Sequence, residues 1–88
     1  MKVEHARELG EGYSVEIGAA TWNPEGRSLR NRYATVNGGF NPHSSSEVPI
    51  GDLVPMLQFA GEHDALTTLQ CAVIIESLSA SIRRQSQG

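Results

Sequence analysis

Apolar and polar residues alternate along residues 13–22, which read YSVEIGAATW. A period of two residues is typical of a β-strand with one face against a core. The next four residues, NPEG at 23–26, favour a reversal of the chain. Proline presets the first central position of a type I turn, and glycine suits the left-handed position that closes a three-residue loop. The pattern therefore predicts an antiparallel hairpin whose second strand runs through residues 27–35.

The turn also predicts how the two strands pair. A three-residue loop places Asn23 opposite Arg27 and, counting outward, Ile17 opposite Tyr33. A two-residue loop would instead place Arg32 opposite Ile17 and bury a guanidinium on the core face, which is costly unless the charge is paired. We therefore expect the looser register, in which the apolar positions of both strands share one face.

The opposite face of the hairpin is the first candidate binding surface. The looser register places Arg30 and Arg32 over the small residues of the first strand, opposite Ala20 and Gly18. Trp22 stands beside them. Such a face can hold a phosphate, a carboxylate or a base stacked on the indole. The alternative is a solvated face on which Arg32 merely reaches a neighbouring carboxylate, that of Glu16. The candidate site residues on the hairpin are Trp22, Arg27, Arg30 and Arg32.

Residues 41–49, NPHSSSEVP, form the second candidate surface. Ser44 and Glu47 match a helix-capping box, but Pro49 disfavours helical geometry in the residue before it. We therefore expect a polar loop that leads into a short edge strand at 47–50, which makes the sheet three-stranded. The candidate partner- or anion-binding residues of this loop are His43, Ser44, Ser45 and Ser46.

Helical periodicity begins after residue 50. Asp52 is a suitable N-cap for a helix at 53–61, and Thr67 with Gln70 forms a capping box for a second helix that runs to about Arg84. The apolar stripe of the second helix is expected to cover the apolar face of the hairpin. Its residues recur at helical spacing: Cys71, Ile74, Ile75, Leu78 and Ile82. The fold class is therefore α+β, with a small antiparallel sheet followed by two C-terminal helices packed on one face.

The length of 88 residues indicates one domain with a modest core. Residues 1–12 are expected to form a loose lead-in, because Gly10 and Gly12 interrupt any regular element. Leu69, Ala72 and Val73 widen the apolar surface of the second helix beyond what so short a sheet easily covers. Either a homodimer or the helix at 53–61 would bury the remainder.

Composition removes several classes of function. No apolar run approaches the roughly 20 residues of a membrane span, and the charged first ten residues do not suit a signal peptide, so a cytoplasmic protein is expected. A single cysteine forms no internal disulfide or cysteine-based zinc site, and no cofactor motif is present. The net charge of −3 opposes a general nucleic-acid binder.

No catalytic constellation is visible either. His43, the serines beside it and Asp52 contain the residue types of a hydrolytic triad, but neighbours in sequence do not supply the rigid geometry of one. We therefore expect a non-catalytic partner-binding protein, an inhibitor or regulatory module of the kind that phages and mobile elements encode. The alternative is a single-stranded nucleic-acid or nucleotide binding domain, because the sheet-then-helix order resembles that of such domains.

Overall fold

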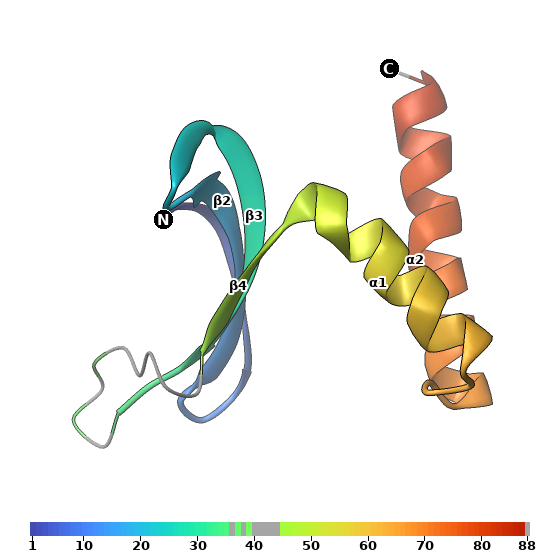
Figure 1. Ribbon diagram of the computed structural model, residues 1–88, viewed down its shortest axis with the longest axis horizontal. Coiled ribbons are helices and arrows are strands. Elements are labelled where there is room, and N and C mark those ends of the chain that lie inside the picture. The colour runs from blue at the N-terminus through green and yellow to red at the C-terminus, as the bar shows by residue number, and fades with distance from the viewer. Residues whose placement is uncertain (36, 38, 40–44, 88) are drawn as a thin grey trace. The chain divides into compact units, whose positions relative to one another are not determined.

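The computed structural model (Figure 1) describes residues 1–35, 37, 39 and 45–87, which form four strands and two helices. The elements are β1 Lys2–Gly10, β2 Tyr13–Ala20, β3 Asn23–Tyr33, β4 Ser46–Pro49, α1 Ile50–Glu62 and α2 Thr68–Gln87. This arrangement confirms the α+β class. The chain divides into two compact units, Met1–Val54 and Pro55–Gly88, which we call the sheet unit and the helical unit. The packing of the helices on the sheet stays a prediction.

The sheet is an antiparallel meander with strand order β1-β2-β3-β4. It has one strand more than the sequence pattern predicts, because the expected lead-in forms β1. The reason lies in Gly12, whose φ of 73° is the left-handed conformation that glycine adopts without strain. Gly10 and Gly12, which were expected to interrupt any regular element, therefore lie at a reversal of the chain. Gly10 pairs with Tyr13 across this turn.

The register between β2 and β3 differs from the predicted one. Ile17 lies opposite Leu29, not Tyr33, because the chain already reverses at Thr21 and Trp22. The ladder passes from the Ala19–Arg27 pair directly to the Ala20–Asn23 pair, so residues 24–26 form a bulge within β3. The NPEG segment thus bends a strand and does not connect two strands. The Asn23 side chain stabilises this bend by accepting a hydrogen bond from Glu25 N at 3.1 Å.

Side chains of the apolar face come from the three longer strands and from β4. Directly opposed residues of an antiparallel pair share a face, so Ile17, Leu29 and Val48 lie on the same side of the sheet. The four-residue difference in register leaves this assignment intact, because an even shift keeps every side chain on its face. The apolar side chains on this face are half-buried.

The most tightly packed part of the sheet consists of small residues. Within the described chain, the buried residues are Gly18, Ala20 and Ser28, all on the polar face. A Cβ atom added to Gly18 would collide with the backbone carbonyl of Lys2 on β1. Glycine at this position therefore lets the first two strands approach each other.

The helices begin and end where local signals place them, with small shifts. Thr67 N donates to Gln70 Oε1 at 2.9 Å and Gln70 N donates to Thr67 Oγ1 at 3.1 Å, which confirms the capping box of α2. The first helix begins at Ile50 and continues past Gly61, the predicted end, to Glu62. Asp64 then takes a left-handed conformation with φ of 52°. None of the described helices is long and apolar enough to span a membrane.

The close approach at Gly18 leads to a prediction about stability. Gly18→Ala should lower the free energy of unfolding by about 1–3 kcal/mol, because the added methyl group forces β1 away from β2. Gly10→Ala is the matched control, since a Cβ atom there has no neighbour within 4 Å. Urea unfolding of both variants would measure the difference. Equal losses would show that β1 does not pack closely on Gly18.

Candidate functional site

The centre of the polar face contains an ion pair. Arg30 lies directly opposite Glu16, and its Nε and Nη2 atoms donate to Glu16 Oε1 at 2.8 Å and 2.6 Å. The two side chains are only 16% and 12% exposed. The alternative prediction, a solvated face, had Arg32 in contact with Glu16. In the structure Arg30 makes this contact. One of the two arginines expected to meet a ligand thus holds β2 and β3 together.

The other candidates on the hairpin are spread apart. Arg32 lies opposite Ser14 on the same face as Arg30, whereas Arg27 forms an exposed ion pair with Glu4 at 3.0 Å. Trp22 lies in the turn after β2 and is 56% exposed. The observed register moves Arg30 four residues along β2 from its predicted partner, about 13 Å farther from the turn. The predicted groove of two arginines beside an indole is therefore wrong.

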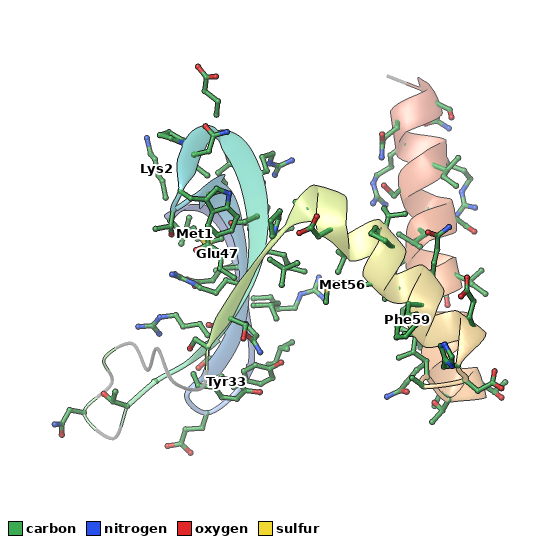
Figure 2. All side chains as sticks on the ribbon, in the orientation of Figure 1. Met1, Lys2, Tyr33, Glu47, Met56 and Phe59 are labelled. Carbon is green, nitrogen blue, oxygen red and sulfur yellow. The ribbon has the colours of Figure 1, made fainter. Side chains whose placement is uncertain are left out.

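Glu47 is a contact point that sequence reasoning did not identify. Its carboxylate accepts hydrogen bonds from Thr21 N at 2.9 Å, Thr21 Oγ1 at 2.8 Å and Ser28 Oγ at 2.9 Å. The Met1 ammonium group donates to the same Thr21 hydroxyl at 2.9 Å, and Figure 2 shows Met1 beside Glu47. One side chain of β4 thus joins the β2–β3 turn, β3 and the first residue.

The pKa of Glu47 follows from these contacts. Burial by itself raises the pKa, but the hydrogen bonds from Thr21 and Ser28, with the nearby Met1 ammonium charge, outweigh burial and hold the pKa below its ordinary value of 4.5. The charged form is therefore the one that stabilises the fold. No local motif predicts these contacts of Glu47, because Thr21 and Glu47 are 26 residues apart.

The predicted polar loop at residues 41–49 is described only from Ser45 onward. His43 and Ser44 lie outside the described residues. Ser45 Oγ accepts a hydrogen bond from Tyr33 N at 2.9 Å, and Ser46 N donates to the Asn31 side-chain carbonyl at 2.6 Å. Both serines therefore connect β4 to β3. Their positions are explained by the sheet, without a ligand.

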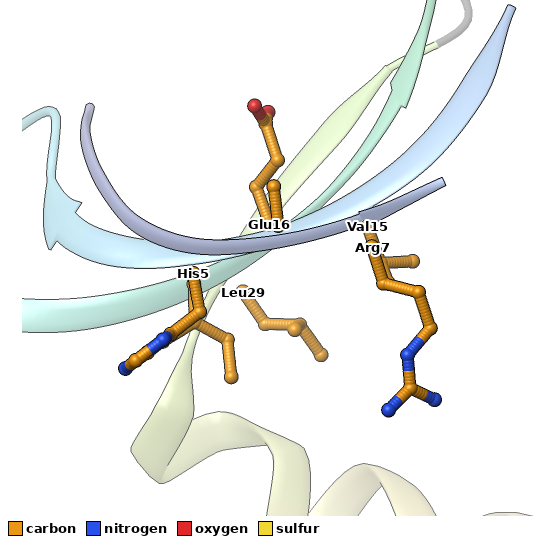
Figure 3. A pocket seen from close by; sticks show the side chains of 7 residues that line it. His5, Arg7, Val15, Glu16 and Leu29 are labelled. Carbon is orange, nitrogen blue, oxygen red and sulfur yellow. The ribbon is translucent and has the colours of Figure 1, made fainter. Parts of the chain in front are cut away.

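The apolar face carries a hollow of about 200 Å³ that includes two basic side chains. Figure 3 shows His5, Arg7 and Leu29 on one side of the sheet and Glu16 on the other. His5 and Arg7 were missed because their segment was expected to lack structure. The available signal was their separation by one residue, which places both on the same face of a strand. The hollow is lined by His5, Ala6, Arg7, Val15, Glu16, Ile17 and Leu29.

The helical unit has many exposed apolar side chains. Neither helix contains a buried residue, and the best-covered apolar side chains of this unit are only half-buried. The stripe expected on the second helix is exposed at three positions, at 63% for Ile75, 54% for Leu78 and 64% for Ile82. The large apolar side chains exposed in this unit are Met56, Phe59, Leu69, Val73, Ile75, Leu78 and Ile82.

Neither a metal site nor a known relative helps to assign a function. Within the described part of the chain, no group of three or more His, Cys, Asp or Glu residues lies close enough to hold a metal ion. The sequence matches no protein-family model, and no curated protein or solved structure matches it significantly.

The two ion pairs of the sheet should differ in their contribution to stability. Arg30→Ala should lower the free energy of unfolding by about 3 kcal/mol, because it leaves Glu16 charged and mostly buried. Arg27→Ala, which removes an exposed pair, should cost less than about 1 kcal/mol. Urea unfolding at neutral pH measures both. Similar losses would mean that the Glu16–Arg30 pair is no better shielded from water than the Arg27–Glu4 pair.

Glu47 should make the fold sensitive to acid. A carboxyl group whose pKa is lowered by folding stabilises the protein above its ordinary pKa, and this stabilisation disappears as pH falls through the lowered value. Thermal unfolding should therefore show that Glu47→Gln is less stable than the parent at neutral pH, with a gap that narrows below pH 4.5. Glu62→Gln, an exposed carboxylate on α1, is the control. A gap that is independent of pH would contradict the role of the charge.

Proposed function

We propose that this chain is a non-catalytic protein-binding module whose main binding surface is the helical unit. The observation that carries the proposal is the exposure of seven large apolar side chains on a unit of 34 residues. Large exposed apolar side chains on a small protein often mark an interaction site, because their exposure to water is unfavourable.

Phe59 is the strongest single candidate for an anchor. It is 64% exposed on α1, and its ring lies 4.5 Å from the ring of His63, measured between centroids. Aromatic side chains dominate the energy of many protein interfaces, since they bury a large area and lose little conformational freedom. Figure 2 shows Phe59 and Met56 on the same helix, so one partner surface could cover both.

The hairpin residues take a secondary place in this proposal. Arg30 already has Glu16 as its partner, whereas Trp22 is exposed in the turn of the sheet unit. The finer description is part of the same proposal: an inhibitor or regulatory module, of the kind that mobile elements encode, acting in the cytoplasm. Its support is the small size of the chain and its exposed apolar side chains.

A single-stranded nucleic-acid or nucleotide binding domain is the competing proposal. Arg30 and Arg32 share one face of the sheet, which would suit phosphate groups. Glu16 and Glu47 also lie on this face, directly opposite Arg30 on its two neighbouring strands. These carboxylates oppose a phosphate backbone, so the balance of charge favours the protein-binding proposal.

Capture of partners from a lysate of the source organism tests the proposal. A protein should remain bound after nuclease treatment, and Phe59→Gln should reduce its affinity at least about tenfold, as removal of an interface anchor does. Gln58→Glu, an exposed polar position on the same helix, is the matched control.

Other results would point elsewhere. Loss of the captured protein on nuclease treatment would favour the nucleic-acid proposal. In that case binding should weaken with salt and with Arg32→Glu. Arg30→Glu is unsuitable for this comparison, because it would place a third carboxylate between Glu16 and Glu47 and disturb the fold itself.

A further inference from the structure

β1 forms one edge of the sheet and pairs with a strand on one side. The strand order places β2 beside it and, within the described residues, no strand beyond it. The N–H and C=O groups of β1 that point away from β2 therefore have no backbone partner in the described chain. The strand is nine residues long and contains no proline, so every outward N–H group is able to donate.

This row of edge groups calls for an extended partner, whatever the position of the helical unit. The interior of a helix uses its N–H and C=O groups within the helix, so a helix has none to offer an edge strand. Packing of a helix on a face of the sheet also leaves the edge groups unpaired, because they point along the plane of the sheet. Water or another strand is what pairs with a whole row of such groups.

The side chains in the middle of β1 specify the charge of such a strand. The ladder is regular from His5 to Glu8, between two register shifts. His5 and Arg7 lie opposite Ile17 and Val15, so both point to the apolar face, as Figure 3 shows. Within the described sheet unit, no carboxylate forms an ion pair with Arg7. A carboxylate on an added strand would pair with this guanidinium and accept a hydrogen bond from the His5 ring.

A second copy of β1 is a poor match for this edge. Directly opposed residues of an antiparallel pair share a face, so the basic side chains of one copy would stand beside those of the other. Opposed like charges are unfavourable across strands, so the partner strand needs acidic side chains on the face of His5 and Arg7. On the other face, the carboxylate of Glu8 disfavours further acidic residues. Acidic and uncharged residues should therefore alternate along the partner strand.

The opposite edge of the sheet shows this mode of pairing. β4 has only four residues, yet all of them pair with β3, and Glu47 lies directly opposite Arg30. A short strand with a carboxylate thus joins a strand that presents an arginine. The regular part of β1, from His5 to Glu8, offers the same length for pairing.

We infer that β1 binds an extended acidic segment of a partner protein, which adds to the four-stranded sheet as a further strand. Main-chain hydrogen bonds supply the affinity of such an addition, and the side chains beside them supply its specificity. Arg7 and His5 select the acidic residues of the segment. This inference goes beyond the proposed function, because it assigns a second surface, on the sheet unit, with its own class of partner.

A short capped peptide in which glutamate alternates with threonine is the probe for this inference. NMR titration of the full chain should show saturable shifts of the amides from His5 to Glu8, and their hydrogen exchange should slow. The same peptide with lysine in place of glutamate should bind at least about tenfold more weakly, since its charges oppose Arg7. N-methylation of the central residues of the glutamate peptide should also weaken binding at least about tenfold, because ladder hydrogen bonds are lost.

Charge reversal in the protein gives the matched comparison. Arg7→Glu should bind the lysine peptide more tightly than the glutamate peptide, a gain that also shows that the variant is folded. Arg84→Glu on α2 changes the net charge equally and should keep the preference of the parent.

Several results would overturn the inference. They are equal binding of the glutamate and lysine peptides, undiminished binding of the N-methylated peptide, and the absence of saturable shifts in β1. Signals of β1 that change with protein concentration alone would assign the edge to a second copy, and would overturn the acidic partner as well.

Discussion

The shielded polar contacts between strands are the interactions on which the rest of the sheet unit depends. The buried positions of the described chain are Gly18, Ala20 and Ser28, none of which brings much apolar area out of water. In the sheet unit, the backbone ladders and shielded polar contacts join the strands. The Glu16–Arg30 pair and the carboxylate of Glu47 supply such contacts on the polar face.

These contacts distinguish structural residues from candidate binding residues. Polar side chains that look available in the sequence, Arg30 and Ser45 among them, are already bonded to neighbouring strands. Apolar side chains that resemble core residues in the sequence, Ile75 and Leu78 among them, keep more than half of their surface exposed. The proposed function therefore assigns binding to the apolar surface of the helical unit, since burying that surface would require no existing bond to be broken.

Short-range patterns predicted those elements whose signals lie within a few residues. The alternation along β2, the capping box at Thr67 and Gln70, and the long C-terminal helix are all present. The register failed because NPEG has the chemistry of a hairpin loop and of a strand bulge alike. The strand β1 was missed because all nine of its residues are exposed, so no buried stripe marks it.

The sequence by itself determined the α+β class, the face on which the hairpin residues 13–20 and 27–33 lie, and the start of α2. Each of these features depends on the periodicity of apolar residues or on contacts between residues close in sequence, and both can be read from the sequence. Only the tertiary structure decided that Glu47 bonds to Thr21 and Ser28, that Arg30 pairs with Glu16, and which apolar residues remain exposed. These outcomes depend on which strands become neighbours and in what register, and the pairing energy is spread over residues far apart in the chain.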